Sequence, residues 1–197
     1  MKVGRIKEDQ DYEGIRVTFL GYLEKGRLPV QIDIGFGDAI TPDPVWTSYP
    51  TLLENPSPIL LAYPRETVLA EKFEAMVKLG IANTRMKDFH DLNTLASLFP
   101  FSSPSLSEAI RRTFERRKTP LPQEALPTAL TAEFYNDPTK QKQWEAFVSK
   151  NKLYIAPITL QEVTDSIQAF VIPVLPSPDS ENVPDLKWEP GGPWQQV

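Results

Sequence analysis

The chain has 197 residues and a formal net charge of -5, which allows one domain or slightly more and argues against indiscriminate nucleic-acid binding. It contains no cysteine and a single histidine, His90, so disulfides, thiolate metal sites, cysteine nucleophiles and multi-histidine metal sites are excluded within these residues. No apolar run approaches the roughly 18 residues that span a bilayer, and the N-terminal segment lacks the apolar stretch of a secretion signal. We therefore expect a soluble cytoplasmic protein with no membrane partner.

Two segments near the N-terminus alternate apolar and polar residues in the manner of β-strands. The first covers about residues 12–24 and the second about residues 30–36, and a short loop containing Gly26 joins them. We expect these segments to pair as an antiparallel hairpin. A further strand is expected beside them, because two strands alone are marginally stable. Asp33 points away from the apolar face of the second strand, and an acidic residue is unusual in the middle of a strand.

A proline-rich excursion follows at residues 38–64, with a short extended piece at 59–62, and helices come after it. Helical spacing predicts two helices between Tyr63 and Leu98, the first ending at Gly80. Three further helices are predicted from start signals, at Ser105 to about 118, Asp137 to about 150 and Thr159 to Pro173.

Strands followed by helices indicate an α+β fold. We expect three parts: residues 1–62 with the strand pair and the excursion, residues 63–175 as a helical body, and residues 176–197 as an extended proline-rich tail. Trp188 and Trp194 are candidate anchors for this tail.

Charged residues interrupt the apolar faces of the two central helices. Lys72 falls inside the apolar arc of the first helix, and Asp88 falls inside the arc of the second, while Asp91 lies just beyond its edge. A charge on a buried helix face lowers the stability of the fold unless it is paired, so an unpaired one is kept only for a function. Lys72 and Asp88 are therefore either a buried ion pair or part of a site wall, and spacing alone favours the ion pair. Asp91 is expected to cap the helix or to pair with Arg85 or Lys87.

The same residues, with Asp33, have the chemistry that phosphoryl or nucleotidyl transfer requires. Carboxylates hold Mg²⁺, which prefers oxygen ligands, and a lysine neutralises phosphate charge in the transition state. The alternative is a structural Lys72–Asp88 ion pair with Asp33 merely exposed.

Three stretches resemble the AbiEii/AbiGii toxin family, whose members have the nucleotidyltransferase fold. The longest begins at Tyr63 and reads Y-P-x-E-T-V-x-A-E-K-x-E-A-M-V-x-L-G-x-x-N-x-R-M-K-D-F-x-D-L. The run V-Q-I-D-I-G-F-G-D-A-I around Asp33 resembles the family strand that carries the third active-site carboxylate, and the closing P-G-G-P-W resembles the tail of one branch. The resemblance covers the chain from about Tyr12 onward.

This resemblance implies roles for the candidate residues. Lys72 matches the lysine that contacts the nucleotide phosphate, Asp88 matches the aspartate of the following helix, and Asp33 matches the third carboxylate near Mg²⁺. Family members transfer a nucleoside monophosphate from an NTP to an acceptor, which is a tRNA 3′ end in some of them. The implied protein partner is a cognate antitoxin with a winged-helix part.

The family's first motif, a Gly-Ser followed by D-x-D on the next strand, is missing. No Gly-Ser dipeptide occurs in the chain, and Asp9 and Asp11 form D-Q-D in a polar segment without one, so they are weak candidates for metal ligands. We expect a truncated family member with no or very weak catalysis, because one carboxylate does not replace three in a two-metal site. The alternative is a non-catalytic remnant that binds an antitoxin or oligomerises.

A basic cluster lies near the end of the third helix, between Arg111 and Lys118. It has two interpretations: phosphate contacts with an RNA acceptor, or a solvated face whose last-turn cations favour the helix dipole. We prefer the second.

Overall fold

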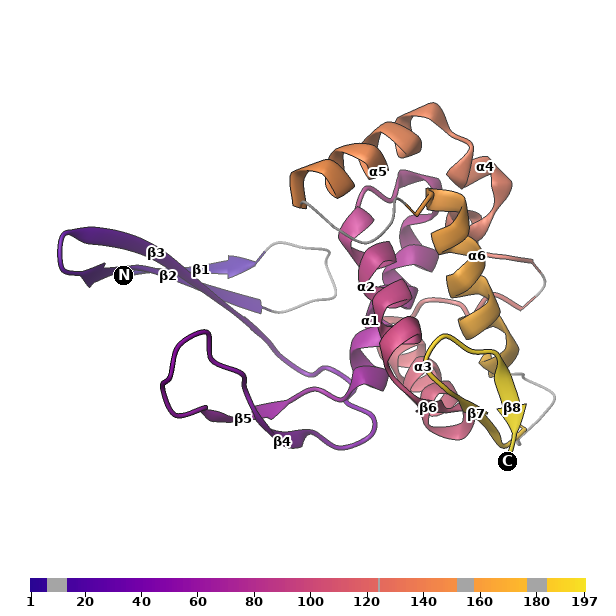
Figure 1. Cartoon of the computed structure of the whole chain (residues 1–197), viewed down its shortest axis with the longest axis horizontal. Coiled ribbons are helices and arrows are strands. Elements are labelled where there is room, and N and C mark those ends of the chain that lie inside the picture. Colours follow the sequence, from indigo (N-terminus) through magenta and orange to yellow (C-terminus); the bar gives the residue numbers. More distant parts are fainter. Residues whose placement is uncertain (7–13, 124, 152–157, 177–183) are drawn as a thin grey trace. The chain divides into compact units, whose positions relative to one another are not determined.

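The computed structural model describes residues 1–6, 14–123, 125–151, 158–176 and 184–197. It divides into two compact units, Met1–Asp38 and Ala39–Val197 (Figure 1). Small antiparallel sheets and a larger helical part confirm the α+β class. Within the described ranges, no helix is long and apolar enough to cross a membrane.

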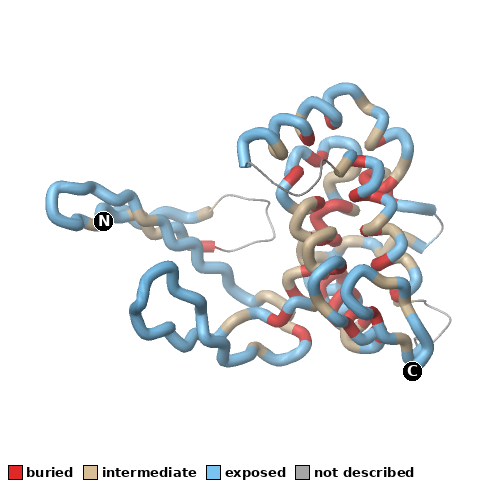
Figure 2. The backbone as a smooth tube through the Cα atoms, viewed as in Figure 1, coloured by how far each residue is buried: buried red, intermediate tan, exposed pale blue. Residues whose placement is uncertain are grey.

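Three strands form the first unit among its described residues: β1 (Lys2–Ile6), β2 (Gly14–Leu23) and β3 (Gly26–Gly35), in the antiparallel order β1-β2-β3. The predicted hairpin is confirmed as β2–β3. The expected third strand is β1, which the sequence pattern did not reveal because it is short and largely polar. Figure 2 shows that these strands are mostly exposed, so the described residues of this sheet form a single layer with few buried side chains.

The second unit begins with a two-stranded hairpin and continues with helices. The hairpin consists of β4 (Val45–Ser48) and β5 (Ile59–Ala62), so the extended piece expected at 59–62 is confirmed. The helices are α1 (Arg65–Leu79), α2 (Met86–Leu98), α3 (Ser103–Arg117), α4 (Ala132–Tyr135), α5 (Pro138–Asn151) and α6 (Leu160–Val171). Short 3₁₀ turns lie at Gly80–Ala82, Thr128–Leu130 and Ile172–Val174.

Helix boundaries follow most of the local signals. Gly80 caps α1 with a positive φ of 49°, which favours glycine. Thr159 and Glu162 form the predicted capping box of α6. The start predicted at Ser105, where S-L-S-E has the pattern of a capping box, is wrong: α3 begins two residues earlier, its N-cap is Ser102, and no side chain caps it. Pro104 fits the first turn of a helix, where an N–H is not needed.

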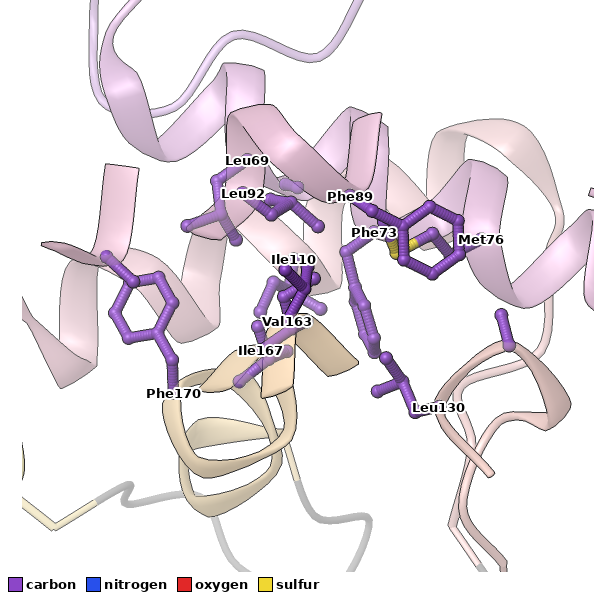
Figure 3. Packing of buried hydrophobic residues seen from close by; sticks show 14 of the residues in the cluster. Leu69, Phe73, Met76, Phe89, Leu92, Ile110, Leu130, Val163, Ile167 and Phe170 are labelled. Atoms are coloured by element: carbon purple, nitrogen blue, oxygen red, sulfur yellow. The ribbon is translucent and has the colours of Figure 1, made fainter. Parts of the chain in front are cut away.

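The core lies between α1, α2, α3 and α6. Its fully buried side chains include the residues labelled in Figure 3: Leu69, Phe73, Met76, Phe89, Leu92, Ile110, Leu130, Val163, Ile167 and Phe170. They recur at helical spacing on each element, so one apolar stripe per helix is buried. This packing fixes α1 against α2, and these two helices carry the candidate catalytic residues.

The last described stretch of the chain, residues 184–197, contains short strands. Its strands β7 (Leu186–Trp188) and β8 (Trp194–Gln196) pair with β6 (Phe101–Ser102) in a small antiparallel sheet. The indole of Trp188 donates a 2.7 Å hydrogen bond to the carbonyl of Ala96, and that of Trp194 donates one of 2.8 Å to the carbonyl of Phe170. Both tryptophans are therefore confirmed as anchors.

Candidate active site

Lys72 of α1 lies between two carboxylates of α2. Its ammonium is 2.7 Å from an oxygen of Asp88 and 2.8 Å from an oxygen of Asp91. On each helix the charged residue stands directly before a buried phenylalanine: Lys72 before Phe73, and Asp88 before Phe89. Each charged side chain therefore lies at the edge of the buried face of its helix. The charges therefore lie at the rim of the α1–α2 contact, where the three side chains are between 15% and 23% exposed.

The two carboxylates keep this lysine charged. Burial works to lower the pKa of Lys72, but its hydrogen bonds to Asp88 and Asp91 outweigh that effect and hold the pKa above its usual value. Burial likewise works to raise the pKa of Asp91, and its hydrogen bonds from Lys72 and Lys87 outweigh that effect and hold the pKa below its usual value. Lys72 is thus suited to supply a fixed positive charge rather than to act as a base.

The sequence reading placed Asp91 outside this cluster. Its expected pairing with Lys87 is confirmed at 2.5 Å, but it also contacts Lys72. The separation of three residues between Asp88 and Asp91 puts both carboxylates on the same side of a helix, and this spacing is the signal that identifies Asp91. His90 lies beside the cluster: its Nδ1 is 3.6 Å from an oxygen of Asp91.

Asp33 belongs to the first unit, on β3. It lies opposite Arg16 of β2, and the guanidinium donates hydrogen bonds of 2.7 and 2.8 Å to the two oxygens of its carboxylate. The side-chain amide of Gln31 donates a third, of 3.1 Å. The hydrogen bond from Arg16 is the main cause that holds the pKa of Asp33 below its usual value. Sequence reasoning missed Arg16, although the hairpin register places it directly across from Asp33.

The described residues do not by themselves fit a divalent metal. No group of three or more histidine, aspartate or glutamate side chains among them has the arrangement of a metal site. Both oxygens of Asp33 accept hydrogen bonds from Arg16, whereas Mg²⁺ takes six oxygen ligands. Asp9 and Asp11, the weaker candidates from the sequence, lie outside the described residues.

The basic cluster of α3 is largely engaged within the chain. Arg111 contacts Glu108 at 2.8 Å and Glu115 at 3.0 Å. Arg117 contacts Glu74 of α1 at 2.8 Å. The exposed pairs of Arg111 agree with the preferred interpretation of a solvated face, whereas Arg117 pairs with a buried carboxylate. Contact of the cluster with RNA stays an untested alternative.

Helical spacing places Glu74 on the side of α1 opposite its apolar arc, where an exposed side chain is expected. It is only 1% exposed, because α3 and the segment after it cover that side of the helix. Its carboxylate accepts hydrogen bonds from Arg117 and from the hydroxyl of Thr119. Two partners satisfy a carboxylate that burial alone would destabilise.

Comparison with known families decides the identity of the chain. A family model described as "Nucleotidyl transferase AbiEii toxin, Type IV TA system" matches residues 2–171. The chain belongs to this AbiEii family. The match extends from β1 to the end of α6, so it includes both units and all three candidate residues, Asp33, Lys72 and Asp88. Neither a curated protein nor a solved structure gives a significant match to the chain.

Membership of the AbiEii family confirms the resemblance seen in the sequence. The family consists of nucleotidyl transferase toxins of type IV toxin–antitoxin systems. An NTP substrate and an antitoxin partner are therefore implied at the level of the family. Of the three candidate residues, the structure brings Lys72 and Asp88 together, while Asp33 lies in the other unit.

Proposed function

We propose that this AbiEii chain provides part of the active site of a nucleotidyltransferase toxin that transfers a nucleoside monophosphate from an NTP to an RNA or protein acceptor. Lys72 binds the nucleotide phosphates, Lys72 and Asp88 are the catalytic residues, and Asp33 is a metal carboxylate. The observation that carries this proposal is the charged Lys72, held at a partly buried helix rim between Asp88 and Asp91, inside the matched region.

The chemistry follows from the charge on Lys72. An acceptor hydroxyl attacks the α-phosphorus of the NTP and releases its proton to water. A new phosphodiester bond forms, and pyrophosphate leaves as the bond between the α- and β-phosphates breaks. Negative charge builds on the phosphate oxygens, and a preorganised ammonium stabilises it. Asp88 and Asp91 hold that ammonium in place. Asp88 accepts a hydrogen bond from it, and Asp91 forms an ion pair with it.

Mg²⁺ is the cofactor implied by the family. Where bound, such an ion neutralises phosphate charge and orients the reacting oxygens. The donors described here do not complete its coordination, because Asp33 is paired with Arg16. The 197 residues also contain no Gly-Ser followed by D-x-D. We therefore propose that this polypeptide alone catalyses transfer weakly or not at all, and that transfer requires a polypeptide that carries the motif.

Transfer of label from each NTP, labelled at the α-phosphate, tests this function. The polypeptide is assayed with Mg²⁺ and either tRNA or protein acceptors, alone and joined to an upstream segment that carries the Gly-Ser and D-x-D motif. We expect transfer only with the added motif, and a loss of at least about 100-fold in Lys72→Ala and Asp88→Ala. Lys78→Ala, on the exposed side of α1, is the matched control. Unchanged transfer in both site variants would show that Lys72 and Asp88 are not catalytic residues.

A second candidate is a non-catalytic remnant that binds an antitoxin or another copy of itself. The incomplete set of metal donors favours it. Calorimetry with Mg²⁺ and each NTP separates the two candidates. Micromolar, metal-dependent nucleotide binding that Asp33→Ala abolishes supports the enzyme, and the absence of any such binding to the extended polypeptide supports the remnant.

A further inference from the structure

The β4–β5 hairpin exposes large apolar side chains on both faces, and the largest of them, Trp46, shares its face with Ile59 and Leu61. Trp46 pairs with Leu61 across the two strands, and Ile59 lies two residues from Leu61, so these three residues share a face. They are 70%, 54% and 68% exposed, respectively, and Figure 2 shows the hairpin as exposed along its length. We call Trp46, Ile59 and Leu61 the Trp46 face.

The loop at the tip of the hairpin continues this apolar surface. Leu52 is fully exposed, and its neighbour Leu53 is largely exposed. The loop is nevertheless organised, because the hydroxyl of Thr51 is 2.8 Å from the carbonyl oxygen of Leu53 and 3.1 Å from that of Asn55. The two leucines are therefore presented by a fixed loop conformation.

The segment just before the hairpin is hydrogen-bonded to helices α1 and α3. The buried hydroxyl of Thr67 on α1 accepts a 2.8 Å hydrogen bond from the backbone N–H of Thr41 and lies 2.9 Å from its carbonyl oxygen. Arg112 of α3 donates a 3.1 Å hydrogen bond to the side chain of Thr41. A hairpin that is ordered before binding loses less conformational entropy when a partner docks.

The charges around the hairpin indicate the kind of partner. The sequence contains no lysine or arginine between Arg27 and Arg65, and within residues 39–64 its charged side chains are Asp43 and Glu54. A nucleic-acid backbone or an anionic membrane surface repels such a segment. A polypeptide with basic residues beside an apolar face complements it in both charge and hydrophobicity.

We propose that the Trp46 face and the Leu52 tip form a docking surface for a polypeptide segment that is apolar on one side and carries lysine or arginine at its margins. Trp46 is the central anchor, because large exposed aromatic residues dominate binding once they are desolvated. Binding at this docking surface does not depend on nucleotidyl transfer. Failure of one proposal therefore leaves the other unaffected.

The proposal is tested with synthetic peptides. The probe is a peptide of leucine and lysine with its leucines at helical spacing, and the comparison peptides replace lysine by glutamate or leucine by serine. Binding to the 197-residue protein is measured by calorimetry. The variant Trp46→Thr/Ile59→Thr removes apolar surface without changing charge, and threonine suits a strand. The matched control, Val3→Thr/Leu28→Thr, removes exposed apolar side chains from the other sheet.

We expect the leucine–lysine peptide to bind at least about tenfold more tightly than either comparison peptide, and the hairpin variant to lose about tenfold in affinity, which corresponds to roughly 1.4 kcal/mol. The control variant keeps its affinity within about twofold, and circular dichroism confirms that both variants are folded. Equal loss in both variants, or equal binding of the glutamate peptide, overturns the proposal. So does self-association in sedimentation that only the hairpin variant abolishes, or binding to phosphatidylglycerol vesicles that only this variant loses.

Discussion

The ammonium of Lys72 donates a 2.7 Å hydrogen bond to the carboxylate of Asp88, from one helix to the next. The same ammonium lies 2.8 Å from Asp91, so a single cation of α1 compensates two acids of α2. The ion pair that the spacing favoured is therefore present. A role of Lys72 in phosphate binding stays a prediction.

Replacement of Lys72 by methionine is expected to lower the free energy of unfolding by about 1–3 kcal/mol, because two partly buried carboxylates lose their common cation. Adding Asp88→Asn should restore part of that loss, since one of the two unpaired charges is then removed. Urea unfolding followed by circular dichroism measures both effects. Lys78→Met, on the exposed side of α1, is the control and should change stability by less than about 0.5 kcal/mol. A similar loss in the control would show that the effect does not come from the ion pairs.

The contribution of Asp91 to stability should depend on pH in the acid range. Its pKa is lower in the folded state than its usual value, because hydrogen bonds from Lys72 and Lys87 outweigh the effect of burial. Its contribution is therefore complete above the unfolded-state pKa of about 3.9 and is lost as the pH falls through the lower folded-state value. The stability difference between the wild type and Asp91→Asn, measured by urea unfolding at pH 7 and below pH 4, should shrink at the lower pH. A constant difference would contradict this.

Much of the site could be predicted from the sequence. Helical spacing alone placed Lys72 and Asp88 on facing arcs, because both residues interrupt an apolar stripe. The same argument failed for Glu74, since a helical wheel for α1 does not show that α3 covers its polar side. Asp33 was correctly placed in mid-strand, but its pairing with Arg16 depends on the register of β2 and β3, which the turn fixes.

The less predictable parts of the fold depend on long-range pairing. β6 has two residues and β7 has three, too few for any alternation to appear. Contacts between residues far apart in the sequence hold them, such as the hydrogen bond from the indole of Trp188 to Ala96. β1 is likewise short and polar. Helices, by contrast, carry their signal locally, and the predicted ends at Gly80 and Thr159 agree with the structure.

Loss of Arg117 should destabilise the helical body more than loss of a surface arginine. Glu74 is buried, and Arg117 supplies one of its two hydrogen-bond partners, so Arg117→Ala leaves a buried carboxylate poorly compensated. We expect a loss of about 3–5 kcal/mol. Arg111→Ala, whose exposed partners are Glu108 and Glu115, should cost about 0–1 kcal/mol. Thermal unfolding of the two variants compares them, and equal midpoints would show that the buried pair has no special role.

Trp188→Phe should separate packing from hydrogen bonding at the C-terminal sheet. Phenylalanine keeps most of the apolar contact with Phe170, whose ring centroid is 4.7 Å from that of Trp188. The carbonyl of Ala96 loses the indole donor but still accepts a 3.0 Å hydrogen bond from the backbone N–H of Gly191. The expected loss in unfolding free energy is about 0.5–1.5 kcal/mol, the net contribution of one hydrogen bond, and Trp188→Ala should lose about 3–5 kcal/mol. Urea unfolding of both variants measures the contributions of the hydrogen bond and of the packing. If phenylalanine were as damaging as alanine, the hydrogen bond rather than packing would dominate.

Removal of the Arg16 guanidinium should raise the pKa of Asp33 toward its ordinary value. In the wild type the hydrogen bonds and charge of Arg16 favour the ionised carboxylate, and Gln31 adds a weaker hydrogen bond. In Arg16→Gln the charge is lost, so Asp33 takes up its proton at a higher pH. The ¹³C chemical shift of the Asp33 carboxyl carbon, followed across an acid titration, reports this change. Arg5→Gln on β1 is the control, because Arg5 lies opposite Ile15 rather than Asp33 and should leave the titration of Asp33 in place. If Arg16→Gln also leaves that titration unchanged, Arg16 does not hold the carboxylate in its ionised state in solution.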